Sequence, residues 1–303
     1  MEQHNSVPSY LRFPTMFPKY KWFKPLLVAL TGFGFYLVFS IALMVIGGVI
    51  AANQGYDFQK LLTGGYDTMD SYSPLGALMS LGSIALFIPA LMIANRIINY
   101  RPFSSYSSSR GGFSFSVFFK CLLVGAIVVS LPIGLTDYLM DGKTGDSRFT
   151  VFGFILCTVL GVLQCCAEEY VFRGLVMQAF GSWIKIPVIP ILIQTVFFAS
   201  MHPYNLTGVI AVAIMGIALG FCAVITKGLE SGCALHIANN MTAFYLTGFG
   251  IGKISSEVNV WSVVIVSALC LIYVGIMLFA DKKLGWFSHV KHPEKMPAAQ
   301  QED

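Results

Sequence analysis

The chain has 303 residues, of which 56% are hydrophobic and 11% are charged, with a formal net charge of +4 and a mean hydropathy of +0.72. An average soluble domain carries roughly 25% charged residues, so this composition excludes an ordinary soluble enzyme or binding domain. It indicates an all-α membrane protein built as a bundle of transmembrane helices. The small basic excess is typical of loops beside an anionic membrane leaflet and does not require a nucleic-acid partner.

Apolar segments long enough to cross a bilayer, about 18 residues or more, recur along the chain. A basic, aromatic tail covers residues 1–25, and two predicted spans with a serine-rich loop cover residues 26–116. Six further predicted spans cover residues 117–280, where we expect the active site, and a polar tail covers residues 281–303. The eight predicted transmembrane helices are residues 26–51, 75–98, 117–135, 152–180, 187–203, 206–226, 232–250 and 258–280.

Lysine and arginine residues mark alternate connections between these helices. Both tails, the connection 96–120 and the turns at Lys185 and Lys227 are basic, whereas the connections 52–73 and 136–148 are more acidic. By the positive-inside rule, we expect both termini in the cytoplasm. The location that these features favour is a bacterial cell membrane, crossed several times.

Three polar stretches lie outside the predicted spans. The stretch 101–116, RPFSSYSSSRGGFSFS, is rich in serine and glycine, which favours a flexible cytoplasmic loop. The N-terminal tail is either an aromatic anchor at the membrane interface or a disordered basic tail, and the C-terminal tail is expected to be mobile. The seven cysteines lie in or beside apolar segments, so they imply neither a disulfide framework nor a CxxC zinc site.

A few ionisable residues interrupt the late apolar segments. They are Glu168, Glu169 and Arg173 in QCCAEEYVFRGLVMQ, His202 in FFASMHP and His236 in GCALHIANN. Ionisable groups inside a bilayer cost several kcal/mol, so they normally pair with one another inside the protein or face a cavity. We therefore treat these residues as candidates for one shared site.

Helical spacing sorts these residues by face. Glu169 and Arg173 are four residues apart and suit an ion pair, whereas Glu168 points about 100° away and has no predicted partner on its own helix. His236 and Asn240 repeat the four-residue spacing on a later helix. Phe198 and His202 repeat it on another, which Pro203 ends or kinks.

The depth of these groups in the membrane imposes a condition on the helix that carries the two glutamates. At about 1.5 Å per residue, Glu168 lies roughly 20 Å from the cytoplasmic turn only if this helix continues to about Trp183. His202 and Asn240 then lie at a similar depth. The helix must be unusually long or tilted.

Simpler interpretations exist for each group alone. The sequence EEYVFR is also compatible with a salt-bridged surface turn, and a histidine before a proline often caps a helix end. His236 and Asn240 are also compatible with hydrogen bonds between neighbouring helices. The shared site is favoured because three separate apolar helices each contribute a complementary group.

The motifs Glu168-Glu169-x-x-x-Arg173, Phe198-x-x-x-His202 and His236-x-x-x-Asn240 occur in this order on successive helices. They resemble the three motifs of the CAAX-prenyl-protease and bacteriocin-immunity family of intramembrane proteases, over roughly residues 150–250. The resemblance implies peptide-bond hydrolysis inside the membrane, without an assigned cofactor.

The resemblance also implies a role for each site residue. Glu168 would act as general base and then acid, with His202 orienting the same water. His236 and Asn240 would stabilise the oxyanion. Glu169, Arg173 and Phe198 would support this geometry, and the substrate would be a membrane-associated peptide or protein.

Two kinds of alternative stay open. In one, Glu168, His202 and His236 bind zinc, as His₂Glu sets do in hydrolases. Against this, the HExxH signature is absent and the sequence suggests no carboxylate partner for either histidine. In the other, the chain is no enzyme: it is an immunity or scaffold protein of the same fold, or a transporter with a proton relay. A transporter is disfavoured because no duplicated half is present.

Overall fold

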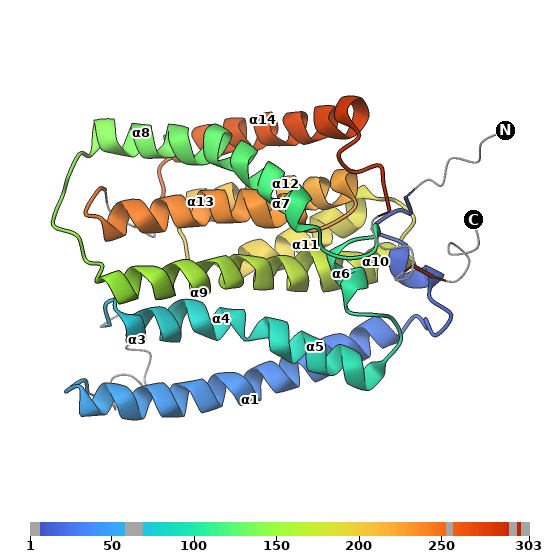
Figure 1. Ribbon diagram of the computed structural model, residues 1–303, viewed down its shortest axis with the longest axis horizontal. Helices are drawn as coiled ribbons and strands as arrows, with labels where there is room; N and C mark the ends of the chain where they lie inside the picture. The colour runs from blue at the N-terminus through green and yellow to red at the C-terminus, as the bar shows by residue number, and fades with distance from the viewer. Residues whose placement is uncertain (1–6, 58–68, 253–256, 291–295, 298–303) are drawn as a thin grey trace.

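The computed structural model describes residues 7–57, 69–252, 257–290 and 296–297. In these residues, long helices run side by side along one direction, and the start of α1 and the end of α14 lie at the same end of the bundle (Figure 1). We name this the terminal end, and the opposite end the distal end. The prediction of an all-α helical bundle is confirmed.

The described residues contain a helical segment at each of the eight predicted positions. Six of these segments are long and apolar enough to cross a membrane. The other two do not meet both conditions, because α11 has only 13 residues and α13 carries too many polar groups. Five of the segments are single helices: α1 (Lys24–Asn53), α11 (Val188–Ser200), α12 (Leu206–Thr226), α13 (Glu230–Gly248) and α14 (Val260–Leu284). The segment Pro74–Ile98 is made of α3 (Pro74–Ala77), η3 (Leu78–Gly82), α4 (Ser83–Ala85) and α5 (Phe87–Ile98), and the segment Phe115–Met140 is made of α7 (Phe115–Gly125), η4 (Ala126–Ser130) and α8 (Leu131–Met140). The segment Val151–Trp183 is made of α9 (Val151–Glu169), η5 (Tyr170–Met177) and α10 (Gln178–Trp183).

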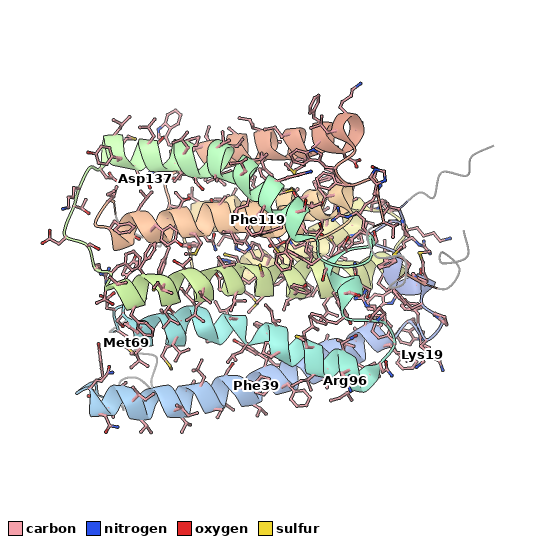
Figure 2. All side chains as sticks on the ribbon, in the orientation of Figure 1. Lys19, Phe39, Met69, Arg96, Phe119 and Asp137 are labelled. Carbon is pink, nitrogen blue, oxygen red and sulfur yellow. The ribbon has the colours of Figure 1, made fainter. Side chains whose placement is uncertain are left out.

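The distribution of side chains is that of a membrane protein. Leu139 and Leu271 are 72% and 73% exposed, whereas Glu169 and Arg173 are completely buried. In Figure 2, Phe39 lies along the length of the bundle, Lys19 lies toward the terminal end and Asp137 toward the distal end. Apolar surface therefore faces outward between two polar ends, as a lipid environment requires.

The helices that carry the motifs pack directly on one another. α13 contacts α7, α9 and α12, and α11 contacts α12 and the η5 segment. α1 packs on α5, away from this group. The three motifs are therefore brought together by one central set of helices.

The serine-rich stretch 101–116 is not a flexible loop, so that prediction is wrong. It contains the short helix α6 (Ser104–Ser107), and Ser108 and Ser109 are fully buried. The Ser108 hydroxyl donates to the carbonyl of Lys227, the residue that caps the end of α12, and the Ser109 hydroxyl donates to the carbonyl of Pro8. Serine-rich composition suggested solvation, but here the hydroxyl groups satisfy backbone carbonyls, one of them at a buried helix end.

The described parts of both tails are also packed. The phenol of Tyr10 donates to the carbonyl of Tyr106, and Leu11 lies against Gly181 of α10. The short helix η1 (Phe13–Met16) continues this packing. In the C-terminal part of the chain, α14 continues to Leu284 and Phe287 is fully buried. The expectation of mobility from Asp281 onward is therefore wrong for these residues. Residues 58–68 of the predicted acidic connection lie outside the described residues.

Candidate active site

The helix that carries the two glutamates meets the length condition set by the sequence. Thr150 caps its start by accepting from the amide of Gly153, and the segment runs without interruption from Val151 to Trp183. The η5 part is a π-helix, with wider turns than an α-helix. Segments of this kind are frequent at functional sites, and this one carries Arg173.

Glu169 and Arg173 form a completely buried ion pair. Arg173 Nη1 lies 2.9 Å from Glu169 Oε1, and Arg173 Nη2 donates to the carbonyl of Gly216 on α12. The guanidinium carbon lies 4.4 Å from the centre of the Phe198 ring. The predicted pair is present, and it connects α9 and η5 with α11 and α12.

Glu169 has a second partner that the spacing did not predict. Its Oε1 lies 2.9 Å from His236 Nδ1 on α13. An ionised carboxylate only accepts hydrogen bonds, so Nδ1 carries the proton and the neutral ring keeps a lone pair on Nε2. α13 can approach closely because residue 232 is glycine: a Cβ there would lie 2.8 Å from Glu169 Oε2.

Glu168 has a partner on its own helix, contrary to the sequence prediction. The amide of Gln164, four residues earlier, donates to Glu168 Oε1 at 2.7 Å. The other oxygen, Oε2, is buried without a hydrogen-bond partner among the described residues and lies 3.5 Å from His236 Nε2. Glu168 thus has one oxygen held by an amide and one oxygen available to a small polar molecule.

His202 lies in the turn that follows α11. Its Nδ1 donates to the carbonyl of Phe198 at 2.8 Å, which leaves Nε2 as an acceptor. The ring of Phe198 lies 4.8 Å from the ring centre of His202 and 5.8 Å from that of His236. Phe198 is therefore an apolar spacer between the two histidines and also covers Arg173.

Asn240 completes the set, one turn after His236. Its Nδ2 lies 3.0 Å from His236 Nε2, and its Oδ1 accepts from Asn239. With one N–H directed to the imidazole, the second N–H of the Asn240 amide is left for another acceptor.

His202, His236 and Asn240 line one cavity of about 270 Å³, and Gln164, the partner of Glu168, lines it too; Glu168 itself lies behind this wall. Its polar wall comes from α9, from the turn after α11 and from α13, so the three motifs do converge as predicted. Its apolar wall comes from η3, α12 and α13. The lining residues are Leu81, Gln164, Phe198, His202, Tyr204, Val212, Met215, His236, Asn239, Asn240, Met241, Ala243 and Phe244.

The donor set was tested for the zinc alternative. The objection that neither histidine has a carboxylate partner is wrong for His236, which has Glu169, whereas His202 has only the backbone carbonyl of Phe198. However, the His236 Nε2 lone pair already accepts from Asn240. Among the described residues, no three His, Cys, Asp or Glu side chains are spaced to hold one ion. In this arrangement the three groups do not fit a metal centre.

Several residues of the site were missed by sequence reasoning. Gln164 and Asn239 orient Glu168 and Asn240, and Gln194 donates to the same Gly216 carbonyl as Arg173. The signal for Gln164 was present, since it precedes Glu168 by four residues on an apolar helix. No spacing rule links Gln194 with Gly216, because that contact joins two helices.

Comparison with known proteins shows what the chain is similar to. The chain is 28% identical over 277 residues, 81% of its length and 92% of the relative's, to the uncharacterized protein YyaK of Bacillus subtilis (strain 168). No solved structure matches the chain. Residues 150–242, which hold all three motifs, match the model of the family described as type II CAAX prenyl endopeptidase Rce1-like. The resemblance is therefore confirmed: this segment is similar to the Rce1-like family of CAAX-type endopeptidases.

Proposed function

We propose that the protein is an intramembrane endopeptidase that hydrolyses a peptide bond of a membrane-associated peptide or protein. The observation that carries the proposal is Oε2 of Glu168, which has no hydrogen-bond partner among the described residues and is buried 3.5 Å from His236 Nε2, a ring that lines the cavity with His202 and Asn240. A site with a free carboxylate oxygen, an imidazole acceptor and an amide donor matches what water-dependent hydrolysis needs.

In the proposed reaction, Glu168 takes a proton from a water molecule that the Nε2 of His202 also orients. The hydroxide adds to the peptide carbonyl, and the carbonyl oxygen becomes an oxyanion. The second N–H of Asn240 donates to this oxyanion, while His236, whose Nε2 accepts the first N–H, positions the Asn240 amide instead of donating itself. Glu168 then gives its proton to the leaving amine as the C–N bond breaks, so that the carboxylate is restored.

The buried charges around the site have supporting roles in this proposal. Glu169 holds the Nδ1 proton of His236 and is itself held by Arg173. This contact fixes the tautomer in which Nε2 of His236 accepts from Asn240. Phe198 keeps the two histidines apart.

We also infer that both termini are cytoplasmic, from the basic connections at the terminal end, and that the membrane is that of a bacterium. The relative in Bacillus subtilis is in keeping with this location.

The direct test is cleavage by reconstituted protein carrying Glu168→Gln. We expect the variant to insert and melt like wild type but to cleave no peptide, because an amide cannot accept the proton of water. Wild-type turnover by this variant would overturn the assignment. The metal-free mechanism is tested on the same preparation: chelators should leave cleavage intact, whereas stoichiometric zinc that is lost on His202→Ala or His236→Ala would contradict it.

A further inference from the structure

A second and larger cavity of about 740 Å³ lies next to the catalytic cavity. The two cavities share two wall residues, Tyr204 and Ala243. The second cavity lies between α8, the end of α13 and the start of α14, at the distal end of the bundle (Figures 1 and 2, where Asp137 is labelled). Its other lining residues are Thr136, Asp137, Met140, Asp141, Thr247, Glu257, Val258, Asn259, Trp261, Ser262 and Ile265.

α13 passes from the terminal end to this second cavity, and its burial changes along the way. Every residue from Glu230 to Ala238 is buried, whereas those from Thr242 to Thr247 are all partly exposed. The change occurs at Asn239 and Asn240, which line the catalytic cavity together with the buried His236. The site is thus closed toward the terminal end and open toward the distal end.

Specific contacts close the terminal end. Arg110 and Glu230 form an ion pair of 2.7 Å whose side chains are at most 3% exposed. The phenol of Tyr273 on α14 donates to the carbonyl of Ser231. Gly125 of α7 lets this helix approach Ala238, since a Cβ at residue 125 would lie 3.0 Å from the Ala238 Cβ.

We call the junction of the two cavities, at Tyr204 and Ala243, the neck. It lies next to His202, a candidate catalytic residue. The ring of Tyr204 stacks on His202 with centres 6.1 Å apart. The next residue, Asn205, binds Glu257 and the backbone of Val258, which precede α14. The wall of the second cavity also carries carboxyl, hydroxyl and amide groups, which suit a hydrated peptide better than lipid chains.

We propose that the second cavity is the entrance for substrate, so that the protease acts on a peptide segment presented at the distal face of the membrane. The statement that the protein cleaves the entering peptide rests on the proposed function. The statement that the site is reached from the distal face rests only on the two cavities. With the termini in the cytoplasm, the distal face is the outer one, and the substrate class is then an exported or outward-facing peptide. Cytoplasmic lipidated chain ends would not reach the site by this route.

The test uses the full-length protein with Ala243→Cys at the neck and a membrane-impermeant maleimide. A protease-removable tag at the N-terminus identifies the terminal face of each vesicle preparation. We expect labelling when the reagent is on the distal face and none when it is on the terminal face. The variant and its control, which keeps Ala243, both carry Cys166→Ser, because Cys166 is partly exposed; the other six cysteines are buried and should stay unlabelled from both faces.

Labelling of Ala243→Cys from the terminal face, or from neither face, would overturn the proposal. Tyr204→Cys, on a different element, gives a second position if the first variant does not fold. Maleimide modification of Ala243→Cys should also abolish cleavage. The same reagent should leave cleavage by the control that keeps Ala243 unchanged. If the wild type cleaves no peptide at all, the proposed function fails, and the labelling pattern still decides the route of access.

Discussion

The two halves of α13 differ in what surrounds them and in what they contribute. The half at the terminal end, Glu230 to Ala238, is buried among ion pairs and small residues. The half at the distal end lines two cavities. The start of the helix therefore serves stability and the part from His236 onward serves chemistry, with His236 just before the change in burial and Asn240 at it. Motif spacing alone does not reveal this division, because i,i+4 pairs look the same in both halves.

The largest effect is expected on stability, from Glu230→Gln in the closed half. Glu230 Oε2 lies 2.7 Å from Arg110, and Oε1 accepts from the amide of Ser114. Removing the charge leaves the buried Arg110 unpaired, which costs about 3 to 5 kcal/mol. Thermal unfolding in detergent should show this loss. A melting temperature equal to that of the wild type would contradict the account of a closed terminal end.

A smaller effect, on turnover, is expected from Asn240→Ala in the open half. Loss of one oxyanion donor lowers the rate by roughly 10² to 10³-fold, and the variant should otherwise fold normally. The control is Asn95→Ala: Asn95 is buried at the terminal end, where it contacts Arg101 and Tyr106. The control should lose stability and keep its turnover per folded molecule. Equal turnover losses in both variants would mean that Asn240 acts only through the fold.

The smallest effect is expected from Gln164→Met. The amide of Gln164 holds Oε1 of Glu168, and a hydrogen bond to a charged group contributes about 1.5 to 3 kcal/mol, or roughly 10 to 100-fold in rate. We expect kcat to fall with little change in KM. Gln178→Met is the matched control, because Gln178 is buried on the same long helix but contacts Arg101 at the terminal end. A kcat loss as large in the control would remove the positioning role from Gln164.

The sequence predicted the bundle, the length of the helix to Trp183 and the buried pair of Glu169 with Arg173. These features depend on apolar runs and on spacing within one helix, which a sequence displays directly. The contact of Glu169 with His236 joins two helices, and it depends on the missing side chain at Gly232. The prediction of a flexible loop at residues 101–116 was wrong because composition alone does not tell whether a serine hydroxyl binds water or a buried carbonyl such as that of Lys227.

The central claim is that catalysis and stability lie in different parts of the same core, and one paired measurement tests it. Melting temperature and cleavage per folded molecule are determined for Glu168→Gln and Glu230→Gln in the same lipid. We expect Glu168→Gln to melt like wild type and cleave nothing, and Glu230→Gln to melt at a lower temperature and cleave normally when folded. A Glu168→Gln protein that cleaves, or a Glu230→Gln protein that folds stably but does not cleave, would contradict the claim.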